Sequence, residues 1–331
     1  MRICRAISRY IGIPVEHVMA TAERAPSSYR KYLVPKRRGG YREIYHPAKE
    51  TKALQIAAVD LLEESAPCLE CVKGYVRGLK TPLVKNALEH AKNQFLLKLD
   101  FNDFFPSIKS DDFKLVCGSW LKLHGDLLDD SDMEFLIKIF FVFNRRSGWF
   151  LGIGAPSSPF ISNWVMYNLD KKIYSICSEL RCIYTRYADD ICIFSNSKEQ
   201  LLSAEKEIRE AVKKCCNPCL TFNDKKRTLA SKWSKRRVTG LTITPTGEVK
   251  VPRKTKRYIR SLLYKYIKNT ISSKERLSLA GYIAFLMDCE PKYLDNLTLK
   301  YGSDTVYRLS LIHISEPTRP LYISYAVFCL K

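Results

Sequence analysis

Residues 183–194 read Ile183-Tyr-Thr-Arg-Tyr-Ala-Asp-Asp-Ile-Cys-Ile-Phe194, two β-branched and aromatic runs on either side of adjacent aspartates. This pattern predicts two short strands joined by a very tight turn, with Asp189 and Asp190 at its tip. The turn lacks the Asn-Gly or Gly-rich pair that a relaxed two-residue hairpin prefers, so we expect the tip to serve chemistry. Adjacent carboxylates repel each other unless a cation lies between them, and Mg²⁺ prefers such oxygen ligands. The alternative is an exposed acidic turn.

A third acidic residue closes a predicted buried strand. The apolar run Phe95–Leu99 is followed directly by Asp100, and a carboxylate in that place needs water, a donor or a metal. Asp189 follows it by 89 positions, which leaves room for a helical excursion that returns the chain beside this strand. The alternative for Asp100 is a helix N-cap, a role also open to Asn102, Asp103 and Ser107.

Size and charge indicate a multi-part protein with a polyanionic partner. The 331 residues exceed the usual size of one hydrophobic core, so two or three subdomains are expected. The 55 Lys and Arg against 34 Asp and Glu give a net charge of +21, which favours nucleic acid because phosphate contacts release counterions. The alternative is a basic chain that is merely soluble.

The sequence predicts a cytoplasmic protein with no membrane partner. Arginines interrupt the apolar residues of the segment Met1–Arg9, unlike a signal peptide, and no run of 18 apolar residues occurs. Of the 12 cysteines, only two groups cluster, and neither has a second pair or histidines at metal spacing. We therefore expect reduced thiols rather than disulfides or zinc at Cys68 and Cys71 and at Cys215, Cys216 and Cys219.

Periodicity and turn residues predict an α+β fold. Helices are expected over 1–28 (the second over Val15–Arg24), 48–66, from Pro82, two within Leu115–Asn144, and over Phe160–Ile176. Tyr29–Pro47 reads as a β-hairpin that turns at Gly39-Gly40. Basic residues at this turn suit a triphosphate, and the alternative is a solvated charged turn; they are Lys36, Arg37, Arg38 and Arg42.

The last third of the chain predicts a short hairpin, a basic helix and a second helix. The hairpin spans Leu241–Val251, and the helix that follows over 252–268 places apolar residues at helical spacing with Lys and Arg elsewhere. A second helix is expected over Ser273–Met287. A basic helix of this kind can track a nucleic-acid duplex; the alternative is a solvated face over core leucines.

The ordered motifs resemble the palm of reverse transcriptases, over about residues 29 to 245. They are Asp100 with Phe105, Gly154-Ala-Pro-Ser-Ser-Pro159, Tyr187-Ala-Asp-Asp190, Asn223-Asp-Lys-Lys-Arg227 and Val238-Thr-Gly-Leu-Thr242. Two elements further resemble bacterial retron reverse transcriptases, namely Asn86-Ala-Leu-Glu-His90 and Val238-Thr-Gly240. One departure is Ile153, where many members of the family have glutamine beside the nucleotide sugar.

The resemblance implies an α+β right-hand polymerase with fingers, a palm of antiparallel sheet plus helices, and a helical thumb. The implied domains are 1–95 (N-terminal helices and fingers), 96–250 (palm, with fingers-side helices over 113–145) and 251–308 (thumb). The catalytic residues would be Asp100, Asp189 and Asp190. Together with the Phe101 carbonyl they would hold two Mg²⁺ ions for in-line nucleotidyl transfer.

The resemblance also implies two sets of binding residues. Phe105 would be a steric gate against ribonucleotides, and the alternative is a core phenylalanine beside Phe101 and Phe104. The nucleotide-binding set is Lys36, Arg42, Asp103, Phe104, Phe105, Gly154 and Ala155. The RNA and primer-template set is Asn86, His90, Tyr187, Val238, Thr239, Gly240, Arg257, Arg260 and Lys265.

The implied function is RNA-directed DNA synthesis in the bacterial cytoplasm. A retron enzyme copies a cognate structured noncoding RNA, both template and primer, from dNTPs into multicopy single-stranded DNA branched from an RNA 2′-hydroxyl. Such systems commonly serve antiphage defence with an effector protein from the same operon. The alternatives are another bacterial reverse transcriptase (intron maturase-like or diversity-generating) and a catalytically silent RNA-binding scaffold.

The C-terminal stretch 309–331 departs from the rest of the chain. Leu309–Arg319 reads like the translation of a sequencing adapter, and the residues after it turn apolar and aromatic. We expect a non-native tail that interrupts the natural chain near Arg308. The alternative is a genuine docking tail.

Overall fold

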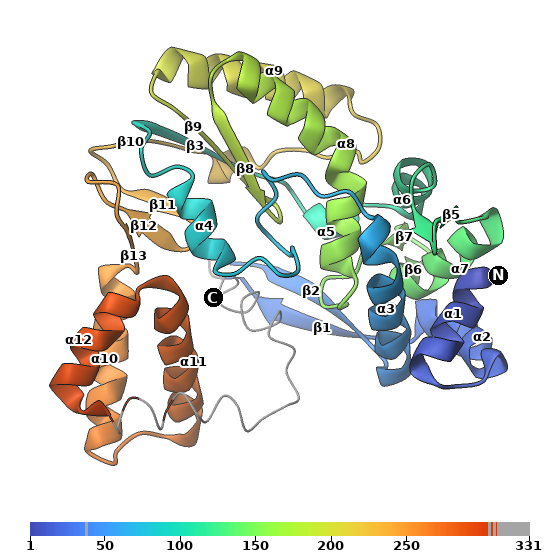
Figure 1. Cartoon of the computed structure of the whole chain (residues 1–331), viewed down its shortest axis with the longest axis horizontal. Helices are drawn as coiled ribbons and strands as arrows, with labels where there is room; N and C mark the ends of the chain where they lie inside the picture. Colours follow the sequence, from blue (N-terminus) through green and yellow to red (C-terminus); the bar gives the residue numbers. More distant parts are fainter. Residues whose placement is uncertain (37–38, 304–305, 307–308, 310–331) are drawn as a thin grey trace. The chain divides into compact units, whose positions relative to one another are not determined.

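The computed structural model describes residues 1–36, 39–303, 306 and 309 (Figure 1). The expected basic turn residues Arg37 and Arg38 and the expected non-native tail from 310 onward lie outside the described residues. The chain forms two compact units that interleave along the sequence. Unit 1 comprises 1–76, 98–191 and 199–227, and unit 2 comprises 77–97, 192–198 and 228–331. The domain limits expected from the sequence stay a prediction.

Unit 1 begins with helices whose apolar faces pack together. The expected pair is present as α1 (Arg2–Ile11) and α2 (Val15–Arg24), and Gly12 ends the first of them in a left-handed conformation. α3 (Lys49–Leu62) contacts both and buries Leu54, Ala58 and Leu62. Short 3₁₀ turns follow α2 and α3, as η1 (Ala25–Ser27) and η2 (Glu63–Ser65).

The predicted basic hairpin is confirmed. β1 (Tyr29–Pro35) and β2 (Tyr41–Pro47) pair antiparallel, with Val34 opposite Arg42 and Pro35 opposite Tyr41. Lys36 N donates to the Gly40 carbonyl at 2.9 Å, which closes the hairpin beyond the last strand pair. Gly39 and Gly40 both have positive φ, which explains why the turn carries glycine at these positions.

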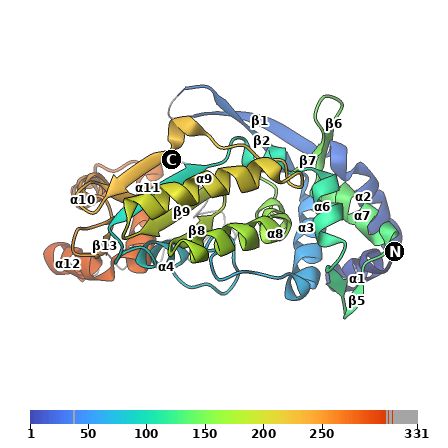
Figure 2. The ribbon, with the colours of Figure 1, turned by 90° about the horizontal axis from the view of Figure 1, so that it is seen from above.

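Four strands form the sheet that carries the acidic residues, in the order β10-β3-β9-β8. Their bounds are β3 (Phe95–Asp100), β8 (Ile183–Tyr187), β9 (Asp190–Ser195) and β10 (Thr228–Ser231). The expectation that the strand of Asp100 lies beside the hairpin of the paired aspartates is therefore confirmed. α8 (Ser158–Glu179) and α9 (Lys198–Lys214) run alongside β8 and β9 (Figure 2). The sequence predicted α8, whereas α9 was not anticipated.

The stretch from 104 to 150 corrects one expectation. Two helices were expected within Leu115–Asn144, but the first of them, α6 (Ser110–Cys117), starts five residues earlier because Asp112 accepts from Lys109 N in a capping box. Two small hairpins also interrupt the region. The elements are α5 (Phe104–Ser107), β4 (Lys122–Leu123), β5 (Asp126–Leu127), α7 (Asp130–Phe140), β6 (Val142–Asn144) and β7 (Gly148–Phe150).

Unit 2 contains a three-stranded sheet and a helical group. The sheet has the order β11-β12-β13, and its predicted hairpin is confirmed. The strands are β11 (Arg236–Val238), β12 (Leu241–Ile243) and β13 (Val249–Lys250). The helices are α4 (Pro82–Leu88), α10 (Arg253–Ile267), α11 (Ser273–Cys289) and α12 (Pro291–Tyr301). The last helix corrects the expectation of a two-helix thumb, and Pro291 at its first turn suits a helix start.

Candidate active site

The three aspartates lie in unit 1, at two places in the four-stranded sheet. Asp100 ends β3, whereas Asp189 and Asp190 occupy the tight turn from β8 to β9. Phe101 N donates to the Asp189 carbonyl at 3.4 Å, which links the two places directly. The following helix α5 has Asp103 at its N-cap position, so the capping alternative does not apply to Asp100. Asp189 and Asp190 are half-buried, so the exposed-turn alternative is also wrong.

The carboxylates influence one another electrostatically. Burial, together with the charges of Asp190 and Asp100, raises the pKa of Asp189 to about 7. Burial also raises the pKa of Asp100; a hydrogen bond from Lys226 opposes this effect, and the charge of Asp190 adds to it. A bound cation would lower the free-energy cost of ionising Asp100 and Asp189.

Two lysines lie against this cluster. Lys226 Nζ is 2.5 Å from Asp100 Oδ1, and Lys98 Nζ is 3.2 Å from Asp190 Oδ2. Sequence reasoning gave neither lysine a role, although Lys226 belongs to the Asn223–Arg227 motif that it singled out. The sequence separation of 126 positions between Lys226 and Asp100 explains the omission, because only the fold brings them together.

The donor chemistry of the cluster fits a hard divalent cation. Three carboxylates lie close enough to influence one another electrostatically, and the ammonium groups of Lys98 and Lys226 already place positive charge against two of them. Over the described ranges, no group of three or more acidic, histidine or cysteine side chains is arranged to hold an ion. The fit therefore rests on the kind of ligands and on their mutual repulsion.

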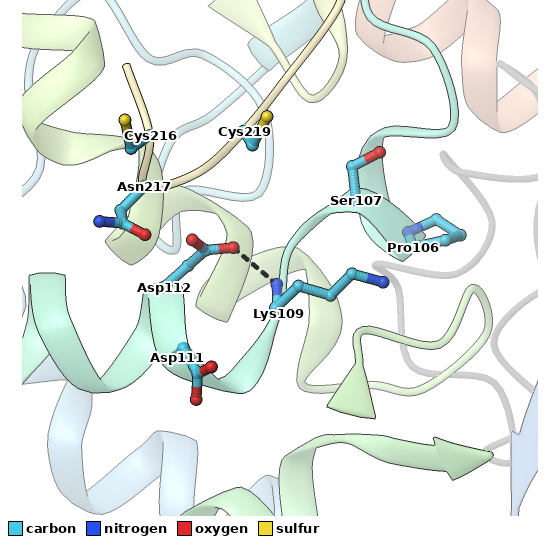
Figure 3. Close-up of a pocket in the computed structure, with 8 residues that line it drawn as sticks. All are labelled: Pro106, Ser107, Lys109, Asp111, Asp112, Cys216, Asn217 and Cys219. Atoms are coloured by element: carbon cyan, nitrogen blue, oxygen red, sulfur yellow. Dashed lines mark hydrogen bonds between the residues drawn. The ribbon is translucent and has the colours of Figure 1, made fainter. Parts of the chain in front are cut away.

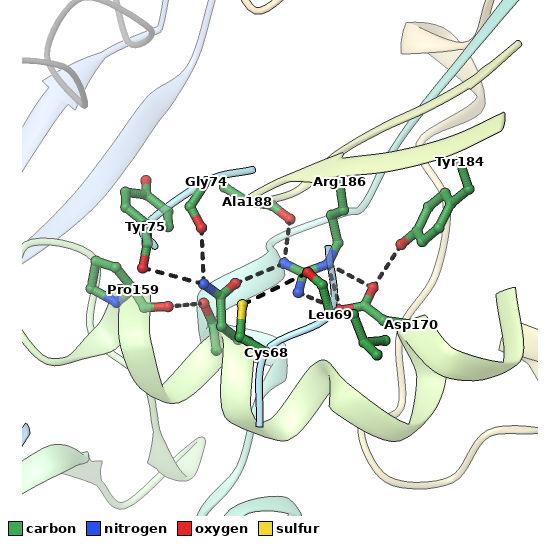
Figure 4. A network of polar contacts seen from close by, with 11 residues as sticks. Cys68, Leu69, Gly74, Tyr75, Pro159, Asp170, Tyr184, Arg186 and Ala188 are labelled. Carbon is green, nitrogen blue, oxygen red and sulfur yellow. Dashed lines mark hydrogen bonds and ion pairs between the residues drawn. The ribbon is translucent and has the colours of Figure 1, made fainter. Parts of the chain in front are cut away.

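A buried ion pair contacts the turn and supports it (Figure 4). Arg186 on β8 and Asp170 on α8 are fully buried, and the guanidinium contacts both carboxylate oxygens, at 2.5 Å for Nη2 to Oδ2. Tyr184 donates to the same carboxylate at 2.6 Å. The remaining Nη1 donates to the carbonyl of Ala188 and to Asn163 Oδ1, each at 3.1 Å.

The contact with Ala188 matters because this residue has a left-handed φ of 57° directly before the paired aspartates. A non-glycine residue holds that conformation only when its surroundings support it. Asn163 links Arg186 to the loop of Gly74, since its amide donates to the Gly74 carbonyl at 2.9 Å. A Cβ on Gly74 would lie 2.9 Å from Ala188 N, so the loop of Gly74 presses on the turn. Sequence reasoning missed this network; the available signal was an arginine inside an apolar strand.

The phenylalanines after Asp100 separate into core and surface. Phe101 and Phe104 are buried, and Phe101 stacks on both Phe104 and Phe222. Phe105 is half-buried and meets Phe104 edge to face. Asp103 is exposed with a φ of 37°.

The basic hairpin is tied to the Gly154 loop. Tyr45 N donates to the Ile153 carbonyl at 2.7 Å. Ile153, which stands where many reverse transcriptases have glutamine, therefore contacts the hairpin through its backbone. Gly154 has a φ of 109°, and a Cβ there would lie 2.8 Å from Ile44 Cγ2 and 3.1 Å from the Tyr45 carbonyl. Ala155 is buried in the same loop.

Gly154→Ala is expected to lower the free energy of unfolding by about 1–3 kcal/mol, because it adds steric overlap to backbone strain. Gly148→Ala is the matched control, since Gly148 also has positive φ (66°) but nothing lies within 4 Å of its Cβ position. Urea unfolding of both variants separates the free-energy cost of the steric overlap from the cost of the backbone strain. Equal losses in the two variants would show that the hairpin does not press on the loop.

The expected RNA-contacting residues fall into buried and exposed groups. Exposed ones are Gly240, Arg257, Arg260 and Lys265, and buried ones are Asn86, His90, Tyr187, Val238 and Thr239. In unit 2, His90 stacks on Phe194 with ring centroids 3.7 Å apart, and Thr239 Oγ1 donates to the Leu83 carbonyl. Lys265 forms an ion pair with Glu275 at 2.6 Å. The two groups therefore cannot act in the same way.

A shallow cavity of about 450 Å³ lies at the start of α6 (Figure 3). Cys216 and Cys219 line it with Asp112 and Lys109. No disulfide joins any of the eleven cysteines in the described part of the chain.

Comparison with known proteins identifies the family. A family model described as reverse transcriptase (RNA-dependent DNA polymerase) matches residues 34–243. The retron Ec83 reverse transcriptase of Escherichia coli is 33% identical over 287 residues, which cover 86% of this chain and 90% of that protein. The chain belongs to the bacterial retron reverse transcriptases. It is thus an RNA-directed DNA polymerase with RNA template and DNA product as partners, in a family that uses divalent metal ions.

Further relatives agree with this assignment. The retron Ec73 reverse transcriptase of Escherichia coli is 32% identical over 288 residues, covering 84% of this chain and 88% of the relative. The apo telomerase structure from Candida tropicalis has a TM-score of 0.51 at 12% identity over 93% of this chain and 63% of that one, which supports the polymerase fold. No helix within the described ranges is long and apolar enough to span a bilayer.

Proposed function

We propose that this retron reverse transcriptase copies a structured noncoding RNA, both template and primer, into multicopy single-stranded DNA. The DNA would be assembled from dNTPs and branched from an RNA 2′-hydroxyl. The match to retron enzymes over most of both chains supports this reading, and the net charge of +21 suits a folded polyanion.

The chemistry would rest on Asp100, Asp189 and Asp190, with the Phe101 carbonyl as a further oxygen ligand. These residues would hold two Mg²⁺ ions, which supply charge stabilisation for the attacking and leaving oxygens. The observation that carries the proposal is electrostatic. Asp189 has its pKa raised to about 7 by burial, by the adjacent Asp190 and by Asp100, which comes from a distant segment of the chain.

Other residues of unit 1 would position the reactants. Lys226 favours the ionised form of Asp100 by its direct contact, and Lys98 forms an ion pair with Asp190. Arg42 and Lys36 on the hairpin would bind the triphosphate, and the guanidinium fork suits phosphate better than an ammonium does. The Gly154 loop, with Ala155, supports this hairpin from one side.

Phe105 would be the gate against ribonucleotides, because its ring is only half-buried while Phe104 fills the core. Phe105→Ala is expected to raise ribonucleotide incorporation relative to deoxyribonucleotide by about 10- to 200-fold, the range that steric discrimination in a pocket provides. Single-nucleotide extension kinetics measure this ratio. Phe105→Tyr keeps the bulk and should keep the selectivity; an unchanged ratio in the alanine variant would rule out the gate.

In unit 2, Arg257 and Arg260 are exposed one helical turn apart on α10 and would contact duplex phosphates. Lys265 would contribute less because Glu275 neutralises it. The buried Asn86 and Val238 would act by shaping the surface around them rather than by touching RNA.

We further propose that the system acts in the bacterial cytoplasm in antiphage defence, with an effector protein encoded in the same operon. The test of the whole proposal is to purify the protein from its native operon and sequence the nucleic acid that co-purifies. A DNA strand joined through a 2′-linkage to RNA is the expected product. Plain cellular RNA without attached DNA would contradict the proposal.

A further inference from the structure

A tryptophan projects from unit 2 between β10 and β11. Trp233 is 86% exposed, whereas Trp164 is buried and the remaining tryptophans are half-buried against other aromatic rings. Leaving so large an apolar ring in water is unfavourable, and this ring contributes nothing to the core. An exposed ring of this kind suits a ligand with a flat apolar face that can stack on it.

The turn that carries the ring is well defined. Ser234 N donates to the Ser231 carbonyl at 3.0 Å, which makes 231–234 a β-turn with Trp233 at its third position. The Ser234 hydroxyl strengthens it, since it accepts from Ser231 N at 2.8 Å and donates to the Ser231 carbonyl at 2.9 Å. The side chain is thus presented by a fixed loop.

The strand after the turn anchors the loop and lines it with charge. Arg236 is fully buried, and its guanidinium donates to the carbonyls of Asn93 and Thr244. Because side chains alternate along a strand, its neighbours Lys235 and Arg237 remain exposed.

The segment of chain that carries the ring has charges of one sign. From Lys225 to Gly247 the chain carries seven Lys and Arg residues and no Asp or Glu. An exposed indole beside basic side chains matches the chemistry of single-stranded nucleic acid, in which bases stack on aromatic rings and phosphates meet cations. A protein partner with an apolar patch would not need this excess of positive charge.

We propose that the 231–237 loop is a binding site for an unpaired nucleotide of RNA, whose base stacks on Trp233 while Lys235 and Arg237 contact the flanking phosphates. RNA is the occupant because the template is the strand that exposes unpaired loops, whereas the DNA product is paired as it forms. The inference rests on the proposed copying of a structured RNA and adds a contact outside the acidic cluster.

The test measures binding of the full chain, without nucleotides, to a single-stranded RNA 12-mer, a DNA 12-mer of the same sequence and a blunt RNA duplex. Trp233→Ala should weaken binding of the single-stranded RNA about 5- to 150-fold and leave the duplex within about 2-fold. Trp233→Tyr keeps a stacking ring and should retain most of the affinity. Leu299→Ala is the control, since Leu299 is equally exposed at 86% in the same unit and should change nothing.

Two further readouts separate stacking from charge. Indole fluorescence should be quenched by the RNA in the wild type, and this quenching should disappear in Trp233→Ala. Lys235→Ala with Arg237→Ala should reduce the slope of log affinity against log salt by about 1.4, or about 0.7 for each phosphate contact with a single strand.

Equal RNA affinity of the alanine variant and the wild type would overturn the proposal, as would an effect confined to the DNA 12-mer or shared with Leu299→Ala. The outcome is independent of catalysis, because no DNA is made in the assay. A chain that binds RNA through Trp233 yet yields no branched DNA would defeat only the proposed function.

Discussion

The double variant Asp189→Asn with Asp190→Asn is expected to lose DNA synthesis by at least about 1000-fold and to keep its RNA affinity nearly intact. A thousandfold loss corresponds to about 4 kcal/mol of transition-state stabilisation, which lies within what metal-assisted charge stabilisation supplies. Asparagine keeps the shape of the side chain but removes the charge that would hold a cation. Primer extension on an RNA template and RNA binding are the two measurements.

Stability provides an internal check on this variant. The folded-state pKa of Asp189 is raised from 3.8 to about 7, so the folded protein holds a proton that the unfolded chain has already released. The stability of the wild type in chelator should therefore fall as the pH rises from about 4 to about 7. The variant should lose less over that window, because asparagine does not ionise.

The control for the Asp189→Asn with Asp190→Asn variant is Asp130→Asn. This change removes an exposed carboxylate of unit 1 that pairs with Lys114 at 3.2 Å. It should leave synthesis unchanged, since surface ion pairs contribute little. DNA synthesis that persists in the double variant would remove the proposed mechanism. Loss of RNA binding together with synthesis would show that the turn has a structural role instead.

Arg186→Met is expected to destabilise the protein by about 3–5 kcal/mol, because it leaves the carboxylate of Asp170 buried without its cation. That cost is a large part of the 5–15 kcal/mol typical of a folded domain. Adding Asp170→Leu should restore much of the stability, since a buried pair can be replaced by apolar side chains of similar size. Urea unfolding of the single and double variants measures both effects.

The activity of the double variant Arg186→Met with Asp170→Leu decides whether Arg186 positions the catalytic turn. Even with stability restored, the Ala188 carbonyl has lost its donor, so kcat for primer extension should stay low while KM for dNTP changes little. Asn163→Ala removes one neighbouring contact and should give a smaller loss of kcat. Recovery of kcat along with stability would show that the ion pair serves the fold alone.

Local chemistry made much of the fold predictable. The β1–β2 hairpin follows from Gly39-Gly40, and α10 follows from apolar residues at helical spacing. Predictions were wrong where a cap or a proline overrode the periodicity, as at the start of α6 and at α12. The tyrosine and paired aspartates at 187–190, read with the other motifs, also indicated the family that the comparisons identify.

The sequence by itself determined the family, the positive charge, the hairpin with its acidic tip and most of the helices. These features depend on residues close together in the chain, where backbone preference and side-chain spacing are sufficient. Only the tertiary structure decided that Lys226 meets Asp100, that Arg186 lies fully buried on Asp170 and that Trp233 stands in solvent. Contacts between distant residues, and the exposure of any one side chain, depend on how the elements pack, and no local pattern encodes them.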